Sequence, residues 1–140
     1  SNSNKQQGYC NGMRKNGAKE ADIWLYEAEA SSLQGGYDVT QKIFDEHPDV
    51  EGIVYSIDLI AVGGIRAAHD RGIRVPEQVG MIGVDNSIYG EICIPKLTTL
   101  NNKLYDLSES AALLLREGLE GRVQSKKMML FSEIIEREST

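Results

Sequence analysis

Short apolar segments and helical segments alternate along this chain, and this alternation limits the folds open to it more than any other feature. Three apolar runs of 4 to 6 residues, bounded by turn-forming or charged residues, lie at 23–26, 52–56 and 79–84. Strands that are apolar throughout are typical of a parallel sheet covered by helices on both faces. We therefore expect three parallel strands connected by helices.

Helical patterns precede and connect these runs at 7–16, 36–47 and 59–71. Gly17 and Gly72 follow the first and third patterns, at positions where glycine commonly ends a helix. The second pattern must stop before Pro48, because the residue ahead of a proline is pushed out of helical geometry. Asp58 is the expected N-cap of the third. The order of elements predicts right-handed crossovers and an α/β fold with a doubly wound parallel sheet.

The C-terminal part has a different pattern. Residues 97–99 are short and β-prone, 102–118 place leucine and alanine at helical spacing, and 128–135 are mostly apolar. We expect a short strand, then an amphipathic helix with Asn101 or Asn102 as its cap, and then a last strand.

Net charge, hydropathy and cysteine count limit the classes of function that this chain can have. The 140 residues carry a net charge of −6, which makes the chain a poor candidate for gripping nucleic-acid phosphates or an anionic membrane. No apolar run approaches the roughly 18 residues of a membrane span, and no charged-then-apolar leader opens the sequence. Cys10 and Cys93 are too few for a disulfide scaffold and fit reduced, partly buried thiols. We expect one domain's worth of chain, a cytoplasmic location and no membrane contact.

The helical pattern at 59–71 is apolar or small almost all the way round, whereas an ordinary surface helix has one apolar stripe. Gly63 and Gly64 each cost about 1 kcal/mol relative to alanine inside a helix, and close contact with another backbone would offset that cost. We expect the sheet to cover one side of this helix and a second subunit to cover the other. The predicted dimer-interface residues are Ile60, Gly63, Gly64 and Ala67. Complete burial within the single chain is the alternative.

Two acids follow the predicted strands, at the sheet edge where open parallel sheets bind ligands. Asp58 follows 52–57 and Asp85 follows 79–84. A carboxylate placed there can accept two hydroxyl hydrogen bonds in its plane, which suits vicinal sugar hydroxyls or a ribose. The alternatives are simple helix capping by Asp58 and a turn formed by Asp85 with Asn86.

No catalytic constellation stands out. His47 and His69 have no Cys, Asp or Glu partner at metal-ligand spacing, and neither a phosphate-binding loop nor a nucleophile elbow occurs. We expect no enzyme activity, no cofactor and no metal. One enzymatic alternative is a receiver-like phospho-acceptor site formed by Asp58, Asp85, Thr98 and Lys96. That site needs an acidic pair at the end of the first strand, which this sequence lacks.

Several segments, in this order and spacing, resemble the lactose/galactose repressor family. They are Gly35-Gly36-Tyr37, GIVYSIDLIAVG at 52–63, GIRVPEQVGMIGVDN at 72–86, PKLTTL at 95–100 and EREST at 136–140. The similarity runs from about Lys5 to the end. It implies a dimeric transcriptional regulator with an N-terminal helix-turn-helix head and a two-lobed sensor of the type I periplasmic-binding-protein kind, which closes over a sugar or nucleobase.

The resemblance also implies how this chain divides. Residues 1–96 correspond to the C-terminal lobe of the sensor, and 97–140 supply the crossover, helix and strand that would complete the missing N-terminal lobe. The DNA-binding domain lies outside this chain, so operator DNA would be bound only through that absent part. A periplasmic-type solute-binding protein of a transport system is an alternative with the same fold.

The resemblance assigns effector-binding roles residue by residue. Asp85 matches the effector-binding aspartate of a G-x-D-[DN] motif, and Lys5 stands where the family usually has a ligand-clamping arginine, whose two-pronged geometry lysine lacks. Ile57, ahead of Asp58, replaces a polar residue that often reaches the ligand, and Ser31 replaces a stacking aromatic. These two departures point away from a standard sugar, and an oligomerisation module with a non-functional pocket is a further alternative.

Overall fold

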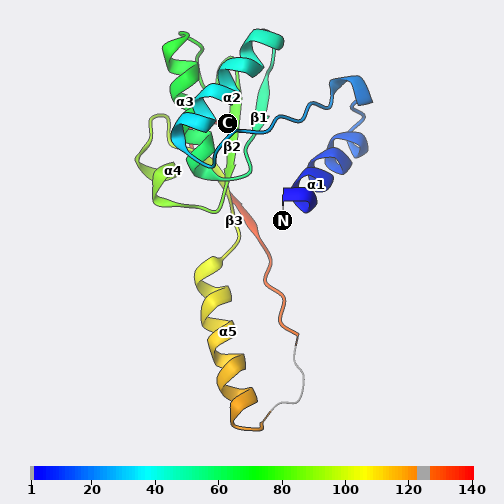
Figure 1. The fold of residues 1–140 in the computed structure, drawn as a ribbon, viewed down its shortest axis with the longest axis vertical. Coiled ribbons are helices and arrows are strands. Elements are labelled where there is room, and N and C mark those ends of the chain that lie inside the picture. The colour runs from blue at the N-terminus through cyan, green and yellow to red at the C-terminus, as the bar shows by residue number, and fades with distance from the viewer. Residues whose placement is uncertain (1, 123–126) are drawn as a thin grey trace.

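The computed structural model describes residues 2–122 and 127–140 of this chain, and their strands form one mixed sheet (Figure 1). The strand order is β1-β2-β3-β4, with β1 at Gly52–Val54, β2 at Gly80–Val84, β3 at Thr98–Asn101 and β4 at Glu133–Ile135. The first three strands are parallel, and β4 runs antiparallel to β3. The predicted α/β class with a mainly parallel sheet is confirmed.

Four helices match the predicted helical segments, although α1 begins at Asn2 instead of residue 7, and α4 was not predicted. The helices are α1 (Asn2–Lys15), the 3-10 helix η1 (Glu20–Asp22), α2 (Leu33–Glu46), α3 (Asp58–Asp70), α4 (Ile88–Ile92) and α5 (Leu104–Leu119). The Ser32 hydroxyl caps α2 by accepting from the Gly35 N–H at 3.0 Å, and α2 ends before Pro48. Gly17 and Gly72, just beyond α1 and α3, have φ of 87° and 68°, which glycine adopts without strain.

Helix α3 is enclosed within this one chain, between α2 and the sheet. A Cβ on Gly63 would lie 2.1 Å from the Leu33 carbonyl oxygen, and one on Gly36 would lie 2.1 Å from the Ile60 carbonyl oxygen. The small residues therefore let α2 and α3 approach backbone to backbone. The predicted interface residues Ile60, Gly63, Gly64 and Ala67 are all buried here. The expectation that another subunit covers them is wrong, because α2 supplies the cover.

The core lies between α3 and the sheet. Met81 and Leu97 are fully buried there, and Tyr55 at the end of β1 is buried against α3. The Tyr55 hydroxyl lies 2.9 Å from Thr40 Oγ1 on α2. Burial raises the pKa of Tyr55 well above its ordinary value, so this hydroxyl stays neutral and links β1 to the helix layer.

The run at 23–26 is not a strand, which corrects the sequence prediction. Its aromatic side chains pack instead at the end of α2, where the Trp24 ring stacks on His47 with centroids 3.5 Å apart. The Tyr26 hydroxyl lies 2.9 Å from His47 Nε2 and also bonds to Glu46. The aromatic residues of this run therefore pack against the end of α2 and not within the sheet. Leu25, between them, is exposed.

A projecting arm, formed by α5 and residues 127–132, leaves the body beyond β3 and returns to it at β4 (Figure 1). No residue of α5 is buried. The strand expected at 128–135 forms only at β4, where it meets β3. Lys103, with φ of 52°, precedes α5 without a side-chain cap, so the predicted cap by Asn101 or Asn102 is wrong.

The C-terminal segment beyond β4 belongs to the body. The Ser139 carbonyl oxygen accepts from the Met81 N–H at 2.8 Å, and its hydroxyl donates to the Met81 carbonyl at 2.6 Å. The same hydroxyl oxygen accepts from the Thr98 N–H at 2.8 Å, so Ser139 fits between the amino ends of β2 and β3. Because β3 and β4 share one sheet with β1 and β2, the sheet does not end at the division expected after residue 96.

Candidate functional site

The turn after β2 is the most unusual backbone feature at the carboxyl edge of the sheet. Asp85 and Asn86 have φ of 104° and 50°, values that L-residues rarely adopt and that short polar side chains tolerate best. The Asp85 N–H donates to the Leu100 carbonyl at 2.9 Å, and the Asn86 N–H donates to Thr99 Oγ1 at 3.2 Å. Backbone and side chain of β3 therefore hold this turn.

A cavity of about 360 Å³ opens beside the turn, between the body and the base of the arm. Its lining residues are Asp85, Asn86, Asn101, Lys103, Leu104, Tyr105, Asp106 and Glu133. This volume falls within the range of small-molecule sites. Asp85 Oδ1 accepts from Asn102 Nδ2 at 3.2 Å, which orients the carboxylate at the rim.

The lining of this cavity is acidic. It holds the carboxylates of Asp85, Asp106 and Glu133 against the single ammonium of Lys103, which lies 3.6 Å from Glu133 Oε1. Carboxylate oxygens accept hydrogen bonds from hydroxyl and N–H groups and repel anions. The cavity thus suits a neutral, donor-rich molecule better than a phosphate ester.

Asp58 lies beneath the turn instead of lining the cavity. Its side chain is 1% exposed, with Oδ2 accepting from the Ser87 N–H at 2.6 Å and from the Ser87 hydroxyl at 2.9 Å. Oδ1 accepts from Thr99 Oγ1 at 2.6 Å. Gly83 makes room for this carboxylate, since a Cβ there would lie 2.2 Å from Oδ1. The N-cap of α3 is Ile57, so the predicted capping by Asp58 is wrong.

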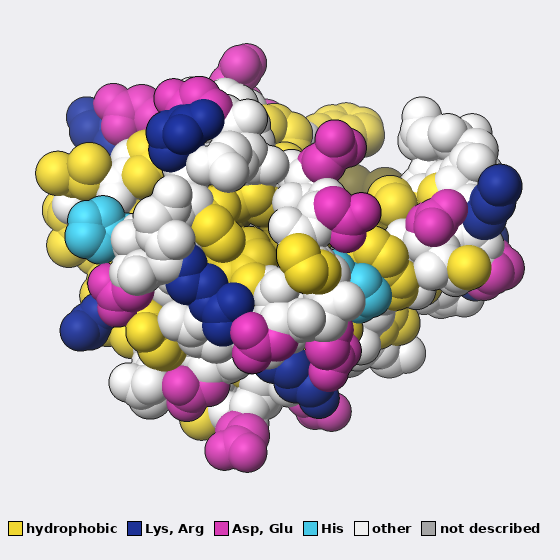
Figure 2. All heavy atoms as spheres, turned by 90° about the horizontal axis from the view of Figure 1, so that it is seen from above, with side chains coloured by type: hydrophobic (Ala, Val, Ile, Leu, Met, Phe, Trp, Pro, Cys, Tyr) yellow, Lys and Arg dark blue, Asp and Glu magenta, His cyan; other side chains and the backbone are white. Residues whose placement is uncertain are grey.

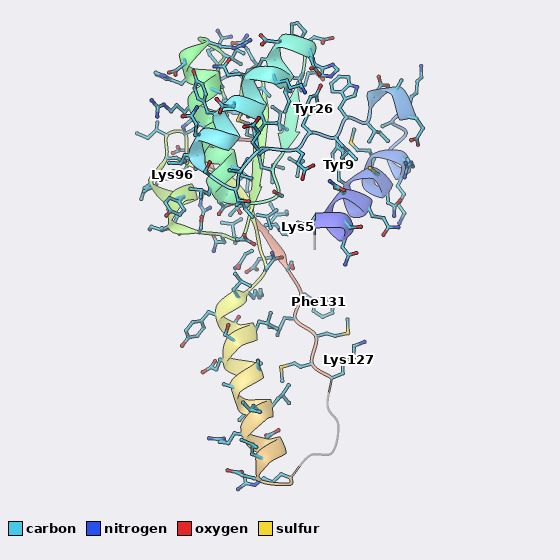
Figure 3. All side chains as sticks on the ribbon, in the orientation of Figure 1. Lys5, Tyr9, Tyr26, Lys96, Lys127 and Phe131 are labelled. Atoms are coloured by element: carbon cyan, nitrogen blue, oxygen red, sulfur yellow. The ribbon has the colours of Figure 1, made fainter. Side chains whose placement is uncertain are left out.

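The other predicted site residues lie apart from this cavity. Lys5 Nζ, from α1, donates to the Ser56 carbonyl at 2.8 Å, which brings Lys5 next to Ile57 at the carboxyl end of β1 (Figure 3). Ile57 is half-buried against the core, and Ser31 is exposed just ahead of α2. Because β1 and β2 are parallel, Ile57 and Asp85 follow them at the same edge of the sheet, and Lys5 contacts that edge from α1.

Sequence reasoning missed Asn102 and Arg137, whose side chains contact the turn from the C-terminal part of the chain. Asn102 binds the Asp85 carboxylate, and Arg137 Nη2 donates to Asn86 Oδ1 at 2.7 Å. Arg137 belongs to the closing segment 136–140, which resembles the repressor family but gives no local sign of a role at the site. Its long-range contact with residue 86 has no local signature.

A second cavity of about 290 Å³ lies at the amino ends of the strands, lined in part by Phe44, Pro48 and Ile73. On the face shown in Figure 2, Lys and Arg side chains are interspersed with Asp and Glu, with no broad basic surface. Among residues 2–122 and 127–140, no cluster of three or more His, Cys, Asp or Glu is placed to hold a metal ion. No helix of these ranges is long and apolar enough to span a membrane.

Comparison with known proteins agrees with this architecture. Residues 2–140 match the family of periplasmic binding protein-like domains. The ribose operon repressor of Halalkalibacterium halodurans is 31% identical over 103 residues, covering 73% of this chain and 31% of that protein. The transcriptional regulator RegA of Clostridium saccharobutylicum is 31% identical over 134 residues, covering 95% of this chain and 40% of that protein.

Solved structures give the same picture. A LacI family transcriptional regulator from Arthrobacter sp. FB24, in complex with lactose, is 32% identical with a TM-score of 0.83, covering 94% of this chain and 49% of that one. The chain therefore spans less than half the length of the proteins named here, all of which are transcriptional regulators and not enzymes. This chain belongs to the periplasmic binding protein-like domain family and corresponds to the C-terminal part of the sensor of LacI-type transcriptional regulators.

Proposed function

We propose that this chain is the effector-binding part of a bacterial transcriptional regulator, and that it senses a neutral, hydroxyl-rich small molecule. The observation that carries the proposal is the Asp85 carboxylate, presented by a turn at the carboxyl edge of the sheet and bordering an acidic cavity. Effector binding would change DNA binding by a helix-turn-helix head outside this chain, in the cytoplasm. One relative is named a ribose operon repressor and one structural neighbour holds lactose, which supports a sugar-like effector.

The effector contacts have distinct chemical roles. Asp85 accepts from two hydroxyls or from ring N–H groups of a nucleobase. Lys5 donates from α1, beside the carboxyl end of β1, and Ile57 and Ser31 border the ligand without a polar clamp or a stacking ring. Asp58, whose oxygens accept from Ser87 and Thr99, acts by supporting the turn. In the longer protein the arm would help to complete the N-terminal lobe, with residues 1–96 forming the C-terminal lobe on the other side of the cleft.

We also propose that a second copy of this chain covers the apolar surface around α4. Ile88, Tyr89, Ile92 and Ile94 are all exposed there, Ile94 by 88%, next to α3. Clustered apolar exposure of this kind is typical of association surfaces. Ile92→Asp should shift a dimer to monomer in light scattering at micromolar concentration, whereas Leu25→Asp, on an exposed leucine elsewhere, should not. A wild-type monomer at that concentration would contradict the dimer.

A thermal-shift screen tests the effector class. The probes are D-ribose, lactose, cellobiose, adenine and guanine, with glucose 6-phosphate as the anionic comparison. We expect at least one neutral probe to raise the melting temperature and glucose 6-phosphate to leave it unchanged, because the cavity lining is acidic. Stabilisation by glucose 6-phosphate alone would contradict the proposed ligand class. Stabilisation by no probe would favour the module with a non-functional pocket.

A further inference from the structure

The turn at Asp85 and Asn86 needs support, because its backbone lies in a sparsely populated region and such conformations persist only where their surroundings fix them. Connected hydrogen bonds from β3 and Asp58 hold the backbone of the turn. The Asn86 N–H donates to Thr99 Oγ1, which itself donates to Asp58, and the next N–H, of Ser87, donates to Asp58 as well. These bonds hold the backbone but leave the Asn86 side chain to be fixed from elsewhere.

Arg137 supplies that contact from the C-terminal segment. Its Nη2 donates to Asn86 Oδ1 at 2.7 Å, and its Nη1 donates to the Leu97 carbonyl at 2.8 Å. The Arg137 N–H donates to Thr98 Oγ1 at 2.9 Å, which fixes the backbone from which the guanidinium extends. The side chain is 13% exposed and lies 3.4 Å from Glu91 on α4. Arg137 therefore spans β3, α4 and the turn at once.

The guanidinium geometry explains why an arginine serves here. Two of its nitrogens donate in fixed directions to two acceptors, one on the turn and one at Leu97, the residue just before β3. A lysine ammonium is a single point charge on a flexible stem and cannot hold both acceptors in the same geometry. The bond to Leu97 fixes the position of the guanidinium, and the bond to Asn86 then fixes the Asn86 side chain in the turn.

We propose that Arg137 is a positioning residue for effector binding: by fixing the Asn86 amide it holds the strained turn, and so the direction of the Asp85 carboxylate. This inference rests on the effector site proposed above. Arg137 does not contact the effector. Since it lies two residues beyond the end of β4, it also ties the return strand of the arm to the site.

The first test needs no ligand. Amide hydrogen exchange is followed by NMR in the full chain for wild type, Arg137→Ala, Arg137→Lys and Arg122→Ala, the last removing an exposed arginine paired with Glu120. In Arg137→Ala we expect the Asn86 and Ser87 amides to exchange at least tenfold faster, while the Tyr55 amide, bonded to Ile82 in the sheet, keeps its wild-type rate. Arg137→Lys should be intermediate and Arg122→Ala unchanged.

A double-mutant cycle with Asn86→Gly separates positioning from general packing. Glycine adopts φ of 50° without strain and lacks the amide, so Arg137→Ala should add no further acceleration at Ser87 in that background. An equal acceleration in both backgrounds would mean that Arg137 acts only through Leu97 and would overturn the inference. Acceleration of the Tyr55 amide to the same degree would also overturn it, since that would report general unfolding.

Isothermal titration with lactose and D-ribose adds the functional readout. If either binds the wild type, we expect about tenfold weaker affinity in Arg137→Ala, and the same affinity for Asn86→Gly with and without Arg137→Ala. Unchanged affinity in Arg137→Ala would contradict the positioning role. If neither probe binds the wild type, the proposed effector class loses support, and the exchange data alone decide whether Arg137 holds the turn.

Discussion

At the scale of single residues, the candidate site depends on a buried carboxylate, that of Asp58, which lies beneath the turn of Asp85. Asp58 accepts three hydrogen bonds from Ser87 and Thr99, at 2.6 to 2.9 Å, and is 1% exposed. Asp85 lies above it at the rim of the cavity. Two acids at the ends of neighbouring strands thus have different roles, one structural and one available to a ligand.

Removing the buried carboxylate should destabilise the fold. We expect Asp58→Ala to lower the free energy of unfolding by about 3 kcal/mol, because the buried Thr99 hydroxyl and the half-buried Ser87 N–H both lose their acceptor. The measurement is the urea unfolding curve, with Asp38→Ala as the control, since Asp38 is an exposed acid that accepts from Gln34 on α2. Equal, small effects of both substitutions would contradict the supporting role of Asp58.

At the scale of elements, the contact between α2 and α3 is the packing that shapes the body. We expect Gly63→Ala to destabilise the chain by about 3 kcal/mol, at the upper end for an added methyl group, because its Cβ would meet backbone atoms of α2. Gly12→Ala is the matched control, since a Cβ there meets nothing within 4 Å, and it should be neutral or slightly stabilising. A shift of the unfolding midpoint in Gly12→Ala as large as that in Gly63→Ala would contradict this packing.

The same scale shows what the sequence could and could not predict. Pro48, Gly17 and Gly72 mark helix ends through local backbone preferences, and those predictions hold. The run at 23–26 has strand composition, but a strand needs a hydrogen-bonded neighbour, which local pattern does not specify. Gly63 correctly indicated a close backbone approach, yet its partner could have been any helix.

The candidate site was predictable to a similar extent. Asp85 follows a buried strand, so its place at the sheet edge could be inferred. The direction of the Asp58 side chain depends on the space left by Gly83 on another strand, and the Arg137 contact joins residues far apart in sequence. Such arrangements become visible only once the fold is known.

At the scale of the whole molecule, the chain consists of a packed body, the helix α1 at its side and the projecting arm (Figure 1). Helix α5 has no buried residue, whereas α3 has its apolar side chains enclosed. We expect peptides from 104–119 to exchange their amide hydrogens far faster than peptides from 58–70 in mass-spectrometric measurements, because local opening of the arm breaks few tertiary contacts. Equal protection of both helices would mean that another surface covers the arm.

The central claim is that the Asp85 carboxylate contacts the effector, and one titration tests it most directly. Asp85→Asn keeps the shape of the side chain and tolerates the positive φ, but it removes the charge and one hydrogen-bond acceptor. For any probe that binds the wild type, isothermal titration should give at least tenfold weaker affinity in Asp85→Asn and wild-type affinity in Asp49→Asn, which changes an acid of the other cavity. Wild-type affinity in Asp85→Asn would contradict the account.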